Sequence, residues 1–476
     1  MRKLVIIIFS LILAFAVGCK QTPETEIVVN KGDGKTESAV YESQLQEGPE
    51  NTSSASSTDA DAFVDEQYSM DIPSTWTDTL SLKWLDVVFD NIEIESSELD
   101  QIPVYELKRS TFLEMNNTLA ALLSYFLPDA TGMREIVMTK SDYEHKMQQL
   151  LRGYYDSEAG GYLQYDQEFQ EEQLRILNER YSEAPDSIPY QTFDLSKLKM
   201  PFSYQFELAD GKVAFVNAKE RSMSIKLGMS NDEIIQRERW LWSGDAIPNE
   251  KPLKKVEGIL ISQEASLTRS NQIMADLGLS DFSLVSVETA RVVWESSVTR
   301  KGYYIVYIRN PGGYIPFDYS TCSDFMLQVQ EGTEQYAAPQ DLECITMFID
   351  ETGVCYFQWN SPYEVQKELA SKVRILGYEK IREIMLQTLR SCLAWNGEDP
   401  QEDPYETLVE GANKYIVRRV VLGSANIVPQ NSANNIVWNI PVWFLEFSSD
   451  NNYNAGDPNT LLAFNAIDGT LLNLGY

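Results

Sequence analysis

The stretch that decides the fold is residues 344–359, which read CITMFIDETGVCYFQW. Two runs rich in β-branched and aromatic residues, 344–349 and 354–359, lie on either side of Glu351-Thr352-Gly353. Apolar runs of this composition on both sides of a short turn containing glycine predict a β-hairpin.

Two helices are expected after this hairpin. Ser361-Pro362-Tyr363-Glu364 has an N-cap serine, a proline in the first turn and a reciprocal glutamate, so it predicts a helix start. The residues expected on the buried face of this first helix are Val365, Leu369 and Val373. Those of a second helix, after Gly377, are Ile381, Ile384, Met385, Leu389, Cys392 and Leu393.

Further strands and helices are expected on both sides of this unit. A hairpin is predicted over 202–216 with a turn at Asp210-Gly211, and further strands near 80–109, 285–295, 302–309, 415–422, 436–447 and 461–467. Helices are predicted over 118–126, over 165–183 and after the possible caps Ser141, Ser230 and Ser262. Strands grouped with helices, without a regular βαβα alternation, predict an α+β fold of antiparallel sheets with packed helices.

The N-terminus carries an export signal pattern. Arg2 and Lys3 precede an apolar run over 4–17, which is shorter than the roughly 20 residues that span a bilayer. Gly18 then leads directly into Cys19, and this ending resembles a bacterial lipobox, although Ala16 stands where the motif prefers leucine. The resemblance implies that the Cys19 thiol receives a diacylglycerol, with palmitate among the fatty acids, and anchors the chain on the extracytoplasmic face of the cell membrane. The alternatives are an ordinary secretory signal and an uncleaved helix.

The segment after the signal changes composition. Residues 19–72 are rich in Ser, Thr, Glu, Gln and Asp and have few clustered apolar residues, so they are expected to form a disordered tether. The expected organisation is a signal peptide over 1–18, this tether over 19–72, an N-terminal α+β domain over 73–215 and a C-terminal α+β region over 216–476, giving two or three folded domains.

Charge and cysteine content exclude several classes of protein. The formal net charge of −32 argues against nucleic acid as a partner, because a polyanion would be repelled. A single histidine and the lack of any Cys-x-x-Cys leave no ligand set for zinc, and no cofactor is expected. Apart from Cys19 the cysteines are Cys322, Cys344, Cys355 and Cys392. Two disulfides are possible in three connectivities, but Cys344 and Cys355 lie at different ends of one hairpin and cannot bridge. Buried free thiols are favoured for Cys355 and Cys392.

Motifs associated with catalysis are incomplete. His145 falls on the polar face of its expected helix, which indicates a surface histidine. Ser196-x-x-Lys199 and Ser449-Asp450-Asn451 match fragments of the penicillin-binding serine enzymes, but Pro201 would break the required helix and the third motif is missing. No catalytic residue is therefore expected, and the chain is predicted not to be an enzyme.

Two other groups of residues have alternative interpretations. Asp450, Asn452, Asn454 and Asp457 have the alternating oxygen side chains of a calcium loop, although Gly456 is one place late and Leu461 replaces the closing glutamate. The alternative is a polar hairpin loop. Several strand-borne aromatic residues could bind a sugar or peptide, but such residues are more often core: Tyr303, Tyr304, Tyr307, Trp438 and Trp443.

A family resemblance rests on the C-terminal motifs. Residues 348–353 (FIDETG), 440–443 (IPVW) and 462–469 (LAFNAIDG), with Trp359, resemble an uncharacterised family of clostridial-type surface lipoproteins, a domain of unknown function. The resemblance spans about 75–476. The closing strand, Asp-Gly turn and strand also resemble PepSY and YycI-like modules, which are small extracytoplasmic α+β domains, some of which restrain peptidases or sensor kinases. The family brings no established catalytic residues.

Together these features predict a lipid-anchored, non-catalytic binding or modulator protein of the cell envelope. Its expected partners are the membrane, through the anchor, and an envelope protein or peptide. One alternative is a solute- or carbohydrate-binding lipoprotein, which requires an aromatic-lined cleft between domains. The other is an envelope hydrolase, which requires two converging carboxylates or a serine–base pair in one pocket.

Overall fold

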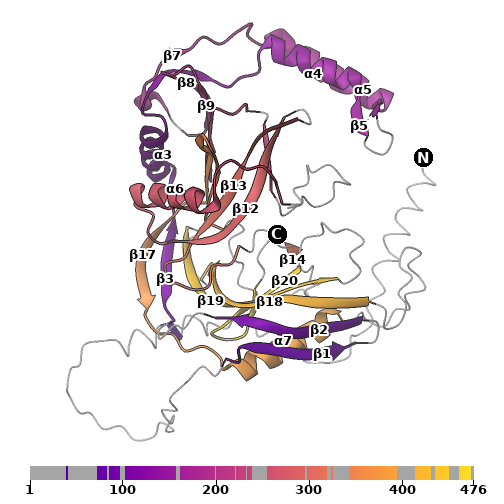
Figure 1. Cartoon of the computed structure of the whole chain (residues 1–476), viewed down its shortest axis with the longest axis vertical. Helices are drawn as coiled ribbons and strands as arrows, with labels where there is room; N and C mark the ends of the chain where they lie inside the picture. The colour runs from indigo at the N-terminus through magenta and orange to yellow at the C-terminus, as the bar shows by residue number, and fades with distance from the viewer. Residues whose placement is uncertain are drawn as a thin grey trace, which may run out of the picture.

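The chain has an α+β fold in a computed structural model (Figure 1). The structure describes residues 39–40, 72–82, 85–96, 102–156, 161–198, 200–219, 221–231, 233–237, 255–294, 297–318, 323–324, 342–393, 413–429, 435–449 and 460–472. The candidates Cys19, Cys322, Lys199, Asn451, Asp450, Asn452, Asn454 and Asp457 lie outside these residues. The side chain of Cys392 also lies outside the described part.

The larger sheet of the described residues has ten strands, and every neighbouring pair in it is antiparallel. In spatial order its strands are β11 (Ile234–Arg237), β12 (Phe282–Trp294), β13 (Ser297–Arg309), β15 (Cys344–Asp350), β16 (Gly353–Asn360), β10 (Ser222–Leu227), β9 (Val213–Lys219), β8 (Phe202–Leu208), β4 (Ala130–Glu135) and β7 (Gln191–Thr192). The hairpins predicted over 344–359 and 202–216 are confirmed as β15–β16 and β8–β9.

A second sheet of nine described strands lies below the first in Figure 1. Its main order is β1 (Thr75–Ser81), β2 (Leu85–Glu95), β18 (Asn413–Ile427), β19 (Ile436–Ser449), β20 (Thr460–Asn465) and β14 (Ser323–Asp324). Outside this order, β3 (Val104–Arg109) pairs with both β19 and β17 (Tyr363–Ala370), and β21 (Leu471–Leu472) pairs with β20. The pairs β2–β18 and β14–β20 are parallel, so this sheet is mixed, whereas its other neighbouring pairs are antiparallel as expected.

Helices cover the sheets with apolar faces. On the ten-stranded sheet, α3 (Phe112–Phe126) and α6 (Gln263–Asp276) contribute Leu119, Leu123 and Ile273 to one core cluster. On the nine-stranded sheet, α7 (Tyr378–Leu393) contributes Ile381 and Met385 to another, and the helix predicted after Gly377 is confirmed. Ser262 caps α6 as predicted, because its side chain accepts from the backbone N–H of Ala265 at 3.1 Å.

Two further helices form a projecting arm. The segment between β4 and β7 contains α4 (Lys140–Arg152), the small sheet of β5 (Tyr154–Asp156) and β6 (Gly161–Leu163), and α5 (Gln167–Glu183). Figure 1 shows the arm extending sideways from the upper end of the molecule, away from both sheets. We call residues 140–183 the α4–α5 arm.

The helix predicted from Ser361 was wrong, because Tyr363–Ala370 forms strand β17. An N-cap needs an extended backbone, whereas Ser361 has φ of 49°. The residues after it pair with β3, and Tyr363 lies opposite Arg109 in that ladder. Pairing with β3, far away in sequence, thus overrides a local helix signal.

The capping boxes predicted at Ser230 and Ser141 also need correction. The backbone N–H of Ser230 donates to Glu233 at 2.5 Å, but strand β11 follows instead of a helix, and Thr299 of β13 donates its hydroxyl to the same carboxylate. In the arm the box is formed two residues earlier than predicted, by Thr139 and Asp142.

Both large sheets combine strands from either side of the domain boundary expected at 215 and 216. This boundary falls within β9. The nine-stranded sheet takes β1 to β3 from before the ten-stranded sheet, β14 from between β13 and β15, and β17 to β21 from after it.

Candidate functional site

The sequence-predicted site residues within the described part of the chain do not converge on one place. His145 is exposed on α4, where its Nε2 lies 3.0 Å from the side-chain amide of Gln149, as expected for a surface histidine. Ser196 lies in the 3-10 turn η1 (Leu195–Lys197), and its hydroxyl donates to Asp194 at 2.6 Å. The same Asp194 carboxylate accepts the backbone N–H of Ser196 at 3.0 Å and caps that turn, so the contact is a local capping interaction.

The candidate aromatic residues belong mainly to the interior. Tyr307 and Trp443 are buried in separate core clusters, and Tyr303, Tyr304 and Trp438 are half-buried. The Tyr307 hydroxyl lies 2.7 Å from Ser270 and donates to Asn271 at 2.8 Å, which fixes the ring against α6. The core interpretation therefore holds for Tyr307 and Trp443.

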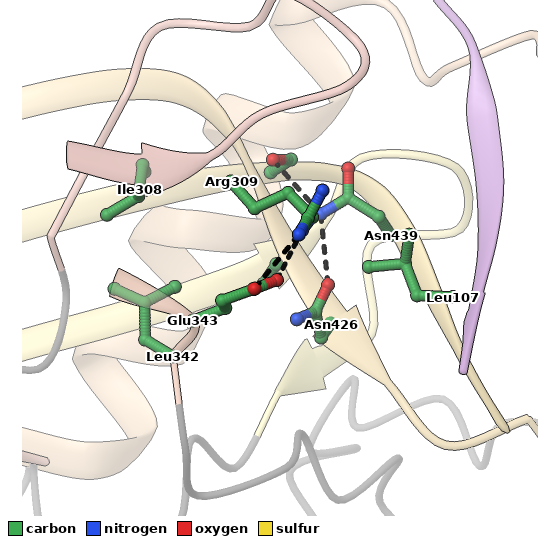
Figure 2. Close-up of a pocket in the computed structure, with 9 residues that line it drawn as sticks. Leu107, Ile308, Arg309, Leu342, Glu343, Asn426 and Asn439 are labelled. Carbon is green, nitrogen blue, oxygen red and sulfur yellow. Dashed lines mark hydrogen bonds and ion pairs between the residues drawn. The ribbon is translucent and has the colours of Figure 1, made fainter. Parts of the chain in front are cut away.

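A small cavity lies where the two large sheets meet (Figure 2). The space admits about one water molecule. Its lining combines the ends of β13 and β15 from the ten-stranded sheet with β3, β18 and β19 from the nine-stranded sheet, and consists of Leu107, Ile308, Arg309, Leu342, Glu343, Ser424, Ala425, Asn426 and Asn439.

Arg309 is the centre of this junction. Its Nη2 donates to Glu343 Oε1 at 3.0 Å and to the carbonyl of Tyr363 at 2.9 Å, and its Nε donates to Glu343 Oε2. Its Nη1 donates to Asp281, and the guanidinium lies 4.6 Å from the ring centre of Phe282. Because Tyr363 begins β17, one buried arginine joins the two sheets.

The electrostatics of this junction follow from burial. Burial raises the pKa of Glu343, and the adjacent Arg309 only partly opposes the rise. Burial disfavours the charged form of Arg309 as well, but the carboxylates of Glu343 and Asp281 outweigh it and raise its pKa. Glu343 also accepts the indole N–H of Trp359 at 2.8 Å. Both carboxylates therefore serve as partners of one arginine, which is not the arrangement of a hydrolytic acid–base pair.

The opposite wall of the cavity has an unmatched acceptor. Asn439 is 4% exposed and donates from Nδ2 to Asn426 at 3.0 Å and to Ser424 at 3.3 Å. Its Oδ1 has no hydrogen-bond partner among the described residues. A buried acceptor beside a space of this size is a suitable place for one ordered water.

The sequence reasoning missed Arg309, Asp281 and Glu343. The available signal was a charged residue directly next to a strand of apolar residues, as in Leu342-Glu343-Cys344-Ile345. Such a charge is rarely buried without a partner, but the sequence gives no way to pair it with an arginine 34 positions earlier.

The two described thiols of the central hairpin are unreactive. Cys344 and Cys355 are both buried and free, which confirms the prediction for Cys355. Burial raises the pKa of Cys355 to about 11 and that of Cys344 to about 12, although Arg300 Nη1 lies 3.3 Å from the Cys355 sulfur. Thiols of this kind are not nucleophiles near neutral pH.

The α4–α5 arm presents an accessible surface. None of the residues of α4 or α5 is buried, and Leu151 and Phe169 are 53% and 48% exposed. Met147 and Leu150 of α4 and Leu177 of α5 are only half-buried. A pair of helices packed on one side only leaves its apolar seam open to a further element.

Comparisons with known proteins do not identify a family. No protein-family model matches the sequence, and the search of curated proteins finds no match. One similar solved structure is an uncharacterized protein from Eubacterium rectale ATCC 33656, with 9% sequence identity and a TM-score of 0.40 over 84% of this chain and 94% of that one.

The described residues contain no helix with the length and apolar character needed to cross a membrane. They also contain no group of three or more His, Cys, Asp or Glu side chains placed to hold a metal ion.

Proposed function

We propose that the chain is a non-catalytic binding protein of the cell envelope, tethered to the extracytoplasmic face of the membrane through Cys19, whose α4–α5 arm contacts another envelope protein or peptide. The observation that carries the binding role is the arm itself, a helical pair without one buried residue that projects from the sheets (Figure 1). The export pattern and Gly18-Cys19 support the anchor.

The described residues favour binding through the arm over the two alternatives, a solute- or carbohydrate-binding lipoprotein and an envelope hydrolase. A solute-binding protein would need an aromatic-lined cleft, whereas the cavity between the two sheets has no aromatic lining residue and admits about one water. For a hydrolase, the acids that converge there, Glu343 and Asp281, are both bonded to Arg309.

The anchor is tested by metabolic labelling with an alkyne analogue of palmitate in cells expressing the full-length chain. We expect the label on the wild type and on Cys355→Ser, and its loss from Cys19→Ser together with release of the protein from the membrane fraction. Label that persists on Cys19→Ser, with unchanged fractionation, would contradict lipidation at Cys19.

The binding role is tested by photocrosslinking in living cells. A photoreactive residue at Glu171 on α5 is compared with one at Lys212, an exposed position in the β8–β9 turn on the body. We expect adducts with an envelope protein or peptide from position 171 and not from position 212. Equal patterns at both positions would rule against the arm as the contact surface.

A further inference from the structure

The free end of the α4–α5 arm exposes three large apolar side chains. Leu151 in the last turn of α4, Leu163 in β6 and Phe169 in the first turn of α5 are 53%, 38% and 48% exposed. We call these three residues the tip patch. They stand at the same end of the arm because Gln170 donates its side-chain amide to the Leu150 carbonyl at 3.0 Å, and Gln164 donates to that of Arg152 at 3.3 Å.

The ends of the two helices hold the tip patch in place. The rings of Tyr165 and Phe169 are 5.4 Å apart, and Asp166 caps α5 by accepting from the backbone N–H of Phe169 at 3.1 Å. Gly153, with φ of 90°, lies so close to the Leu163 carbonyl that a Cβ there would be 2.0 Å from the oxygen. The patch is therefore built on fixed backbone, and exposed apolar area of this kind favours a partner.

The charge around the tip patch is mainly negative, with Arg152 beside Leu151 as the cation at the end of α4. Between Leu163 and Leu174 the sequence holds Asp166, Glu168, Glu171 and Glu172, and no lysine or arginine. Arg175 pairs with Glu172 at 2.8 Å, and Glu171 accepts the side-chain amide of Gln167 at 2.8 Å, while Glu168 and Glu171 remain exposed. An apolar surface with a negative rim is complementary to a cationic amphipathic segment.

The same charges disfavour two other occupants. A second copy of the chain would bring an identical set of acids against these, and like charges facing each other cost free energy. An anionic membrane surface would be repelled in the same way. The half-buried seam of Met147, Leu150 and Leu177 also suits a helix, because a third helix laid along two completes a small bundle.

We propose that the tip patch and the adjoining seam bind a lysine- or arginine-rich amphipathic helix of an envelope protein, with its apolar side on Leu151 and Phe169 and its cations facing Glu168 and Glu171. This inference rests on the proposed binding function and adds the chemistry of the partner. The apolar contact positions the partner helix on the arm, and the carboxylates favour a partner with positive charge.

Peptides of defined chemistry test the proposal. The probe is an 18-residue Leu–Lys amphipathic helix, with two controls: the same peptide with Glu in place of Lys, and a peptide of the same composition without an apolar face. Binding to the exported chain carrying Cys19→Ser is measured by fluorescence anisotropy. We expect the Leu–Lys helix to bind at least about tenfold more tightly than either control peptide.

Variants locate the binding on the protein. The double variant Leu151→Ser, Phe169→Ser should weaken binding about tenfold. Leu113→Ser and Trp294→Ser remove side chains that are 71% and 49% exposed on the body and should leave binding unchanged. Glu168→Gln with Glu171→Gln should weaken binding and flatten its dependence on salt. These positions are exposed, so the thermal unfolding midpoints of all variants should match the wild type.

Several results would overturn the proposal. One is equal binding of the Leu–Lys helix by Leu151→Ser, Phe169→Ser and by the body variants Leu113→Ser and Trp294→Ser, and another is binding of the Glu peptide. A third is that the wild type binds anionic vesicles and the Leu151→Ser, Phe169→Ser variant does not. A fourth is that the wild type forms a dimer and this variant does not. If position 171 crosslinks in cells but the peptides fail, the arm is still a contact surface and only the partner chemistry is wrong. If neither works, both proposals fall.

Discussion

At the scale of the residue, Arg309 links the two sheets. Its guanidinium bonds Glu343 just before β15 and the Tyr363 carbonyl at the start of β17. It also bonds Asp281 just before β12. The side chains of Arg309 and Glu343 are 9% and 1% exposed, so bulk solvent does not reach these bonds, and a partner left alone there keeps the cost of its burial.

The first prediction follows from that burial. Arg309→Met keeps the length of the side chain but leaves Glu343 without its cation, and removal of one member of a buried pair costs about 3–5 kcal/mol. We expect the free energy of unfolding in urea to fall by about that amount. Glu343→Gln should cost less, because an amide oxygen still accepts from Trp359 and Arg309 keeps Asp281.

Lys212→Met is the matched control for this measurement. Lys212 pairs with Asp210 at 2.6 Å, but the two side chains are 68% and 51% exposed, so its removal should change the unfolding free energy by less than about 0.5 kcal/mol. If Arg309→Met and Lys212→Met gave the same small loss, the junction would not depend on the arginine.

At the scale of the element, two similar sequence patterns give opposite structures. Thr111-Phe112-Leu113-Glu114 starts α3 with a complete capping box, and Thr111 has φ of −75° and ψ of 164°. Ser361-Pro362-Tyr363-Glu364 has the same serine or threonine and glutamate spacing, but Ser361 has φ of 49° and a strand follows. A cap contributes only about 1 kcal/mol, whereas β17 gains a ladder with β3 and buries Tyr363.

This contrast shows what the sequence alone could reveal. The hairpins 202–216 and 344–359 were predictable because both strands and the turn are contiguous, and α7 because its apolar spacing covers four turns. The pairing of β17 with β3, 254 residues apart at Tyr363 and Arg109, leaves no local trace. The junction around Arg309 was missed for the same reason, since its partners come from three separate segments.

The second prediction concerns the cap of α3. A hydrogen bond from Lys108 and bonds from the Thr111 backbone and side chain lower the pKa of Glu114 to about 2. Because the folded pKa lies below the ordinary glutamate value of 4.5, this carboxylate stabilises the folded chain above about pH 4.5, and the contribution is lost as the pH falls toward about 2. Glu114→Gln should therefore lower the thermal midpoint at pH 6 and have little effect near pH 2.

Thr111→Ala provides an independent check of the same cap. It removes the side-chain acceptor of the Glu114 backbone N–H and should cost about 1 kcal/mol of unfolding free energy at pH 6. Ser262→Ala at the cap of α6 is the matched control: it should cost a similar amount but, without a Glu114-type carboxylate, should show no acid dependence of its own. An equal effect of Glu114→Gln at pH 6 and at pH 2 would contradict the assignment.

At the scale of the whole molecule, the nine-stranded sheet combines strands from the N-terminal and C-terminal parts of the described chain. β1 to β3 come before the ten-stranded sheet and β17 to β21 after its last strand, so each sheet depends on the other for the position of its strands. The core of the nine-stranded sheet also includes Val40, which is 2% exposed, with Ala39 packed against the same cluster. These two residues are helical and lie inside the segment 19–72 that was expected to be a free tether.

The burial of Val40 leads to the third prediction. If the body holds the chain at Val40, the tether that the sequence predicts after Cys19 is 21 residues long rather than the 53 counted to Ile72. For a flexible coil this shortens the root-mean-square reach from roughly 40 Å to roughly 25 Å. Val40→Asp places a charge where an apolar side chain is buried, which should cost about 2 kcal/mol or more and release residues 39–40.

Hydrogen exchange of the full chain measures this directly. In the wild type the amides around residues 39–40 should exchange slowly, and in Val40→Asp at the rate of an unstructured peptide, while strands β18 and β19 keep their protection. Val137→Asp, at a position 43% exposed between β4 and α4, is the control and should exchange like the wild type. Fast exchange at residues 39–40 in the wild type would mean that the body does not hold the segment, and the longer reach would then apply.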